Sequence, residues 1–269
     1  ISGLSTGLED LDEMTNGLQK TDLIVLAGRP ASGKSTLAMN IAENAGISSN
    51  KPIVVFSLEM PVVQLMNRMI SSLGRINQNR IRTGKLENED WSKLTIASKK
   101  IKDSSIIIND TAGISPSDMR SKVKKVEKEK GEIGLIVVDY LQLMQIPNFK
   151  EGRAAEVSEI SRSLKALAKE MNCPVVALSQ LNRSLENRPN KRPINSDLRE
   201  SGAIEQDADI IIFVYRDEVY NPETTDKGIA EIIISKQRNG EIGTCRTAFL
   251  GHYARFENLS PEVFSYKNY

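Results

Sequence analysis

The sequence contains little of several residue types on which common enzyme sites depend. Its 269 residues include one histidine, His252, and two cysteines, Cys173 and Cys245, which are far apart. A single histidine excludes a multi-histidine metal site and a histidine-based triad, and the cysteines show neither a zinc-binding spacing nor a Cys-x-x-Cys pattern. We therefore expect both cysteines to be buried free thiols in a reducing compartment.

Long apolar segments and a strong net charge are also missing. No apolar run approaches the roughly 20 residues that a membrane-spanning helix requires, and the chain does not open with a signal segment. Lysine and arginine number 36 against 35 acidic residues, so bulk charge neither favours nor excludes a nucleic-acid partner. We expect a soluble cytoplasmic protein without a membrane partner, whose basic surfaces are local.

The chain alternates short apolar runs with amphipathic segments. Hydrophobic residues make up 39% of it, which suffices for one large core. The alternation predicts an α/β fold with a mostly parallel, twisted sheet flanked by helices. The last runs have no long helix between them, which predicts antiparallel strands at the C-terminal end. The expected strands are Asp22–Ala27, Ile53–Ser57, Ser105–Asn109, Leu135–Asp139, Val175–Ser179, Asp209–Tyr215, Ala230–Lys236 and Thr244–Leu250.

Several helices and one loop have defined limits in the sequence. Pro61–Leu73 starts with proline at the first helical position, and a capping box at Ser115–Asp118 should open the helix that follows it. Arg153–Met171 carries an apolar stripe at helical spacing. Asn182–Ser196 is rich in Asn, Pro and Arg and lacks an apolar period, which predicts a loop.

The segment Gly28–Ser35 matches the pattern G-x-x-x-x-G-K-[ST] of a phosphate-binding P-loop. It stands between an apolar strand and the apolar-periodic helix Thr36–Ala45, as the pattern requires. Lys34 should reach the β- and γ-phosphates of ATP or another nucleoside triphosphate, and Ser35 should ligate Mg²⁺. The residues expected to surround the nucleotide are Gly28, Arg29, Pro30, Ala31, Ser32, Gly33, Lys34, Ser35 and Thr36.

Acidic residues stand at the ends of other predicted strands. The carboxyl ends of parallel strands share one crevice, so these residues should lie near Lys34. We expect Asp139 to hold Mg²⁺ through its water shell and Glu59 to be the base that positions the attacking water. Asp110 competes for the role of base, although Thr111 after it makes it resemble a turn residue.

Polar side chains at two further strand ends are candidates for sensing and completing the site. Gln180 follows a strand, where a neutral amide can bind the γ-phosphate and report its loss to the next loop. Lys236 and Arg238 end a later strand, and Arg238 precedes the hairpin signal Asn239-Gly240. A cation on a rigid tip has the form of an arginine finger, and a solvated turn arginine is the alternative.

A local excess of positive charge lies between Leu181 and Asn195. The cations are Arg183, Arg188, Lys191 and Arg192, and the acid is Glu186. A flexible loop with this charge suits a nucleic-acid backbone and needs no contact with bases, and Arg183 is a candidate DNA contact. The loop has no aromatic residue, so we expect little stacking. The more cationic stretch Arg120–Lys130 is interpreted as a solvated helix face.

Several short runs form a specific combination along the chain. They are Ser5–Leu8 with Leu11–Asp12, Leu26–Pro30 leading into Gly33–Ser35, Phe56–Met60, Val137–Gln142, Leu178–Asn182, Asp197–Gly202 and Ser235–Gly240. In this order they resemble the C-terminal ATPase domain of DnaB-type replicative helicases, in the RecA-like branch of P-loop proteins. The resemblance extends from Gly3 to about Glu257. Ser35 replaces the threonine of many such helicases, and both residues supply a hydroxyl.

The resemblance implies a role for each matching residue of the nucleotide site. Lys34 and Ser35 bind phosphate and Mg²⁺. Glu59 is the catalytic base, and Asp139 is the Walker B acid. Gln180 couples the state of the γ-phosphate to the DNA loops.

Other matching residues imply contacts outside the chain's own nucleotide site. Lys236 and Arg238 act in trans, on the nucleotide of the neighbouring subunit. Arg199, Glu200 and Gly202 match the run whose loop touches the backbone of single-stranded DNA.

The resemblance implies a homo-hexameric ring motor in a bacterial cell or a phage-infected host. NTP hydrolysis at subunit interfaces would move it 5′→3′ along single-stranded DNA and separate a forked duplex, with primase and a helicase loader as partners. Two alternatives are a RecA-like recombination or regulatory ATPase that forms filaments, and a nucleotide-dependent loader or assembly factor. The run Asp197–Gly202 favours the helicase.

The expected domain organisation is one ATPase domain over residues 1–258, followed by a tail over residues 259–269. The N-terminal domain and linker helix of DnaB-type proteins are not recognisable in this chain. We therefore expect this piece alone to be monomeric or weakly associating, and to hydrolyse nucleotide poorly, because its finger would arrive only in trans.

Overall fold

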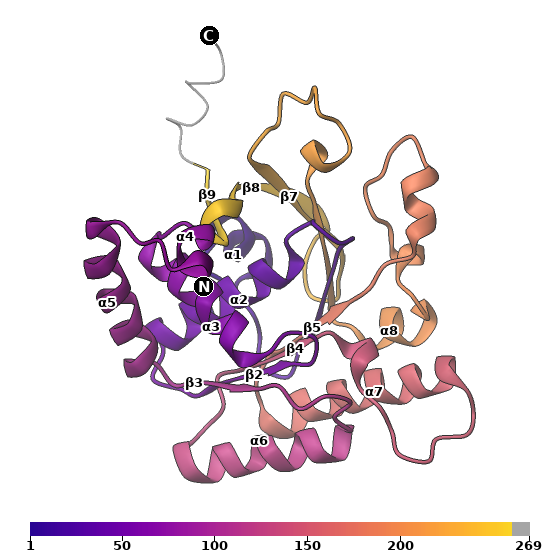
Figure 1. Cartoon of the computed structure of the whole chain (residues 1–269). Helices are drawn as coiled ribbons and strands as arrows, with labels where there is room; N and C mark the ends of the chain where they lie inside the picture. The colour runs from indigo at the N-terminus through magenta and orange to yellow at the C-terminus, as the bar shows by residue number, and fades with distance from the viewer. Residues whose placement is uncertain (260–269) are drawn as a thin grey trace.

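The structure, a computed structural model, describes residues 1–259 and consists of a nine-stranded sheet with helices on both faces (Figure 1). The strand order is β3-β2-β4-β5-β1-β6-β7-β8-β9, parallel through β6 and antiparallel from β6 to β9. The predicted fold class is therefore confirmed. The strands are β1 Leu23–Ala27, β2 Ile53–Ser57, β3 Ile106–Asn109, β4 Leu135–Asp139, β5 Val175–Ser179, β6 Ile210–Tyr215, β7 Ile229–Gln237, β8 Gly243–Leu250 and β9 Arg255–Asn258.

Helices connect the parallel strands, and shorter helical turns follow several of them. The α-helices are α1 Glu9–Thr15, α2 Lys34–Ser48, α3 Val62–Gly74, α4 Gln78–Thr83, α5 Asn88–Asp103, α6 Pro116–Lys130, α7 Arg153–Met171 and α8 Ser201–Asp207. The 3-10 turns are η1 Leu141–Leu143, η2 Arg183–Asn187, η3 Asn195–Asp197, η4 Asp217–Val219 and η5 Gly251–Tyr253. None of the helices within residues 1–259 combines the length and apolarity needed to cross a bilayer.

The structure corrects the sequence predictions at a few places. Pro61 is the N-cap of α3, so this helix begins one residue after the predicted start. Ser115 caps α6 by accepting the Asp118 N–H at 3.1 Å. Strand β9 was not predicted, because its four residues contain only one buried apolar side chain, Phe256. Of the predicted tail at 259–269, all but residue 259 lies outside the described residues.

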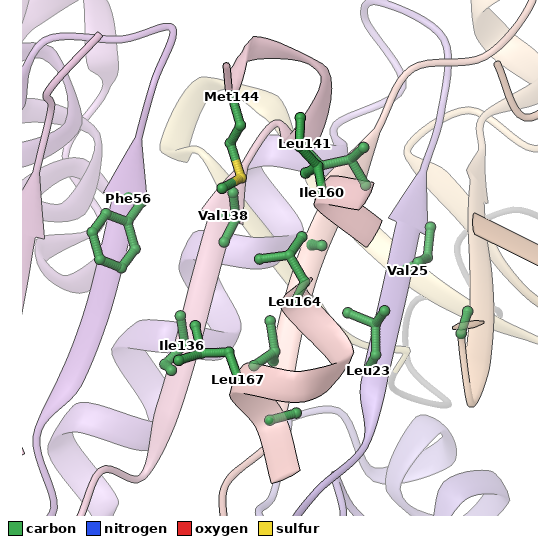
Figure 2. Packing of buried hydrophobic residues seen from close by; sticks show 14 of the residues in the cluster. Leu23, Val25, Phe56, Ile136, Val138, Leu141, Met144, Ile160, Leu164 and Leu167 are labelled. Carbon is green, nitrogen blue, oxygen red and sulfur yellow. The ribbon is translucent and has the colours of Figure 1, made fainter. Parts of the chain in front are cut away.

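Alternating residues of the central strands pack into two separate hydrophobic cores, one on each face of the sheet. In β1, Leu23 and Val25 face the cluster that contains α6, α7 and α8 residues, and Ile24 faces the cluster that contains α1, α2 and α3 residues. Figure 2 shows Leu164 of α7 packed over β1 and β4. Strands buried on both faces explain the near-continuous apolar runs in the sequence. The sheet thus becomes a rigid support, and the polar residues gather at its edges.

Some titratable side chains are buried together with these apolar residues. Cys173 and Cys245 are buried free thiols, as predicted, and burial raises their thiol pKa values to about 12 and about 11. Glu43 of α2 is 3% exposed, and its carboxylate accepts the Ser72 hydroxyl at 2.8 Å. Burial raises the pKa of Glu43 from 4.5 to about 8, the hydrogen bonds from Ser72 and Asn40 and the charge of Arg255 opposing this. The folded protein therefore retains a proton that the unfolded chain loses above pH 4.5.

This proton should make the free energy of unfolding depend on pH. Because the folded-state pKa is raised, the stabilisation is complete below pH 4.5 and is lost as pH rises towards 8. We expect Glu43→Gln to remove that loss, worth of the order of 3 kcal/mol between pH 5.5 and pH 8. Urea denaturation at the two pH values measures it, with Glu127→Gln on the exposed face of α6 as control. Identical pH dependence in wild type and Glu43→Gln would contradict the assignment.

Candidate nucleotide site

The P-loop turns tightly between β1 and α2, and two glycines make this turn possible. Gly33 has a φ of 95°, and a Cβ there would lie 2.9 Å from the ring of Phe256. A Cβ on Gly28 would lie 2.3 Å from the Ser32 hydroxyl oxygen. Larger residues at either position would push the loop outward. The Ser32 N–H donates to the Arg29 carbonyl at 3.0 Å within this turn. The turn and the N-terminus of α2 together have the form of an anion-binding concavity.

Lys34 projects from the first residue of α2 across the carboxyl edge of the sheet. Its Nζ lies 3.5 Å from the Ser179 carbonyl oxygen and 5.6 Å from the centroid of the Tyr140 ring. Burial lowers the pKa of Lys34, whereas the charges of Asp139 and Glu59 raise it. The ammonium is thus partly desolvated and held by weak contacts. The negative charge of a bound phosphate would raise the pKa of Lys34 and so favour its protonated form.

Asp139 ends β4 and is 8% exposed. Its Oδ1 is buried and has no hydrogen-bond partner within residues 1–259. Burial raises the pKa of this carboxyl, and a hydrogen bond from Ser35 and the charge of Lys34 oppose the shift. An orphaned carboxylate oxygen beside a serine hydroxyl is a set of hard oxygen donors, which fits Mg²⁺.

Glu59 and Asp110, the two candidate bases, have different surroundings. Glu59 follows β2, whose extension is tied to β4 by the Leu58 N–H donating to the Asp139 carbonyl at 2.9 Å. The exposed Glu59 side chain lines a cavity of about 360 Å³ with Lys34 and Ser35. Asp110 instead accepts the N–H of Val62, the first residue of α3, at 3.1 Å. This geometry favours Glu59 as the base.

Gln180 bridges the nucleotide cavity and the segment that follows β5. Its N–H donates to Gln142 Oε1 at 3.2 Å, which ties it to the end of β4. Its own Oε1 accepts from the guanidinium of Arg199 at 2.8 Å. The Arg199 N–H also donates to the Gln180 carbonyl at 3.4 Å, so two hydrogen bonds join the predicted sensor to the predicted DNA run. Arg199, Glu200 and Gly202 are all exposed, and Glu200 has a φ of 52°.

The basic segment 182–196 is less free than the sequence predicted. Arg188 forms two 2.7 Å hydrogen bonds with Asp197, and Arg192 binds both carboxylate oxygens of Glu231 at 2.9 and 2.7 Å. Lys191 lies 5.8 Å from the centroid of the Tyr220 ring. Two of the four cations counted in the sequence are therefore paired with carboxylates, and a third lies near an aromatic ring. Arg183 is exposed and has no ion pair within residues 1–259.

The side chain of Arg29 also connects the P-loop to this segment. Its Nε lies 3.0 Å from Glu186 Oε1, and its Nη1 donates to the Leu181 carbonyl at 3.2 Å. The guanidinium of a predicted nucleotide-binding residue is therefore engaged with the loop after β5. Arg29 still lines the nucleotide cavity.

Lys236 and Arg238 lie at the opposite edge of the sheet from the P-loop. In the β6–β7 pair, Lys236 is the partner of Ile211, near the start of β6, and the Arg238 N–H donates to the Asp209 carbonyl at 3.0 Å. The P-loop follows the other end of the parallel strands, where Ala27 is the partner of Phe213. The two cations therefore do not meet Lys34 within one chain. The predicted hairpin between β7 and β8 is present.

Sequence reasoning missed Arg216, which supports the P-loop. Arg216 follows β6, and its guanidinium donates to the Ala31 carbonyl at 3.2 and 2.7 Å. It lies 4.1 Å from the centroid of the Phe249 ring, and Phe249 also lines the cavity. The position of Arg216 at a strand end was a usable signal, since Glu59, Asp139 and Gln180 were found by that rule. Phe249 comes from the antiparallel β8, and no local pattern marks it.

The fold and this edge define a RecA-like P-loop nucleotide-binding domain. The family model "DnaB-like helicase C terminal domain" matches residues 3–258. The chain belongs to this family, and membership implies nucleotide binding.

Curated relatives and solved structures agree with this membership. The chain is 54% identical over 265 residues to "Replicative DNA helicase DnaB" of Buchnera aphidicola subsp. Acyrthosiphon pisum (strain APS), covering 98% of this chain and 58% of that protein. It is 56% identical over 268 residues to the protein of the same name from Pasteurella multocida (strain Pm70), covering 97% and 56%. The chain thus spans little more than half the length of these relatives.

Two solved structures share the fold over nearly the whole chain. One, described as an ATPase domain, matches with a TM-score of 0.93 and 40% identity, covering 97% of this chain and 92% of that one. "The Structure Of A DnaB-Like Replicative Helicase And Its Interactions With Primase" matches with the same TM-score and identity, covering 97% and 62%.

Proposed function

We propose that this chain is the motor domain of a replicative DNA helicase. Residues 1–258 hydrolyse ATP or another NTP at the interfaces of a homo-hexameric ring, translocate 5′→3′ on single-stranded DNA and unwind a fork. The observation that carries the proposal is that Lys34 lies at one end of the parallel strands and Lys236 and Arg238 at the other. A complete site then needs two copies of the chain, with the P-loop of one and the cations of the other.

Within each site, we assign the chain's own residues as follows. Lys34 and the P-loop backbone hold the phosphates. Ser35 and the orphaned oxygen of Asp139 would hold Mg²⁺, which supplies charge neutralisation to the phosphates. Glu59 orients the attacking water, and its exposed position in the cavity supports this role.

We propose that Gln180 and Arg199 couple this site to DNA. Loss of the γ-phosphate would alter the surroundings of Gln180, and its bond to Arg199 would pass the change to the Arg199–Gly202 run. Arg183, Arg199, Glu200 and Gly202 would follow the DNA backbone. Through this coupling, hydrolysis would move the Arg199–Gly202 run relative to the DNA backbone.

The comparisons suggest the setting of this activity. Since the curated relatives are longer, we propose that the full protein assembles as the hexamer and that this chain alone associates weakly. One solved relative is described with its primase interactions. We propose primase and a helicase loader as partners, in the cytoplasm of a bacterial cell or a phage-infected host.

The direct test is unwinding of forked duplexes by the full-length protein. We expect NTP-dependent strand separation that requires a 5′ single-stranded tail, and no separation with only a 3′ tail or with Lys34→Ala. DNA-bound filaments without unwinding would instead indicate a recombination ATPase. Hydrolysis stimulated by a protein partner but not by single-stranded DNA would indicate a loader.

A further inference from the structure

A β-bulge directs the proposed trans cations towards α8. Between β6 and β7, Ile212 pairs with Ile234, but Ile211 pairs with Lys236, so Ser235 is an extra residue in β7. Cross-strand partners point to the same face of a sheet. Ile211 belongs to the core cluster that also contains Ile204 of α8, so Lys236 faces α8. Without the extra residue, Lys236 would face the opposite layer.

Lys236 and Arg238 both donate hydrogen bonds to carbonyl oxygens at the C-terminal end of α8. Lys236 Nζ donates to the Glu205 carbonyl at 2.6 Å and approaches the Gln206 carbonyl at 3.4 Å. The Arg238 guanidinium donates to the same Gln206 carbonyl at 2.5 Å. Carbonyls at the end of a helix carry partial negative charge, which suits cations. The helix itself is anchored, because the Ser161 hydroxyl of α7 donates to Asp207 at 2.8 Å.

Asp209 provides the one carboxylate in contact with Arg238 within residues 1–259. Its Oδ1 lies 3.3 Å from Arg238 Nε, and its Oδ2 accepts from Lys165 Nζ at 2.6 Å and from the Leu23 N–H at 2.8 Å. The Asp209 side chain is 8% exposed, whereas that of Arg238 is 46% exposed. The buried Asp209 carboxylate thus holds the Nε of Arg238, while the side chain as a whole stays exposed enough to reach a neighbouring subunit.

We propose that Asp209 and the C-terminal carbonyls of α8 form a cradle that positions Arg238 and Lys236 for the nucleotide of the adjacent subunit. Asp209 is a positioning residue, since it acts through Arg238 and lies far from its own P-loop. The inference rests on the proposed function, because it gives a structural basis to cations that act in trans. A guanidinium already held in position loses little conformational entropy when the γ-phosphate of the neighbouring subunit binds.

The test compares Lys165→Met with Lys165→Met/Asp209→Asn in the full-length protein. Removing Asp209 alone would leave the Lys165 ammonium largely buried without its carboxylate, and such an unpaired charge destabilises a fold. The double variant removes both charges, and Asn can still accept the Leu23 N–H. In Lys165→Met, Asp209 keeps Arg238 Nε at 3.3 Å and the Leu23 N–H at 2.8 Å as partners. We therefore expect this variant to hydrolyse at the wild-type rate with DNA. The double variant should lose about 10²-fold in kcat, with KM for nucleotide unchanged.

Mixed assemblies locate the defect. Double-variant subunits keep an intact P-loop, so mixing them with Lys34→Ala subunits, which keep the cradle, should restore part of the hydrolysis. Mixing them with Arg238→Ala subunits should not. Equal rates for Lys165→Met and the double variant would overturn the proposal, as would a loss that Lys34→Ala subunits fail to restore. If Arg238→Ala itself keeps the wild-type rate, the proposed trans finger fails instead.

Discussion

Replacing Arg238 by alanine is expected to reduce DNA-stimulated nucleotide hydrolysis about 10³-fold or more. In the proposed trans arrangement, this substitution removes a cation that stabilises charge on the transferring phosphoryl group in the neighbouring subunit. The P-loop of the variant subunit is untouched, because Arg238 lies at the other edge of the sheet. Nucleotide affinity should therefore change little. Steady-state hydrolysis and equilibrium nucleotide binding measure the two quantities on the full-length protein.

A matched control and a mixing experiment make this result specific. Arg246 of β8 has a comparable exposure of 40% and one ion pair, with Asp226, but lies away from the cradle. Arg246→Ala should hydrolyse at the wild-type rate. Mixing Arg238→Ala with Lys34→Ala subunits should regain some active interfaces, since each supplies what the other lacks. Wild-type hydrolysis by Arg238→Ala in the presence of DNA would show that Arg238 is only a solvated turn residue.

Glu59→Gln is expected to lower hydrolysis by about 10² to 10⁴-fold while leaving nucleotide bound. Glutamine has the same shape but cannot accept a proton from the attacking water. The phosphate contacts of Lys34 and the P-loop backbone do not involve Glu59. Single-turnover hydrolysis should therefore fall while the dissociation constant of the nucleotide stays constant.

Asp110→Asn is the matched control for Glu59→Gln. Asp110 accepts the Val62 N–H at the start of α3, and the side-chain oxygen of asparagine can accept the same N–H. The variant should hydrolyse normally. Loss of hydrolysis in Asp110→Asn with normal rates in Glu59→Gln would reverse the assignment of the base.

Local patterns predicted much of the nucleotide site. The glycines of the P-loop are needed because the backbone turns where no side chain fits, and that need is written in the sequence as Gly28 and Gly33. Glu59, Asp139 and Gln180 were found because parallel strands end at one edge, so a polar residue after an apolar run lands there. Asp110 satisfies the same rule. The hydrogen bond from Val62 to Asp110, which no local pattern predicts, is what favours Glu59 over Asp110 as the proposed base.

Contacts between segments far apart in sequence decided which charged residues are paired and which are exposed. The sequence between Leu181 and Asn195 shows an excess of cations, but Glu231 of β7, which binds Arg192, is remote from it along the chain. A count of charges cannot distinguish a cation available to DNA from one paired with a distant strand. The same limit hid Arg216 and Phe249, whose contacts with the P-loop join segments far apart in sequence.

The sequence by itself determined the order of strands and helices, the P-loop and the family to which the chain belongs, because these depend on periodicity and on short runs of adjacent residues. The tertiary structure decided that Lys236 and Arg238 lie at the edge opposite Lys34. It also decided, through one extra residue at Ser235, that both face α8 and Asp209. Strand direction and register are set by packing between distant segments, so no local pattern records them.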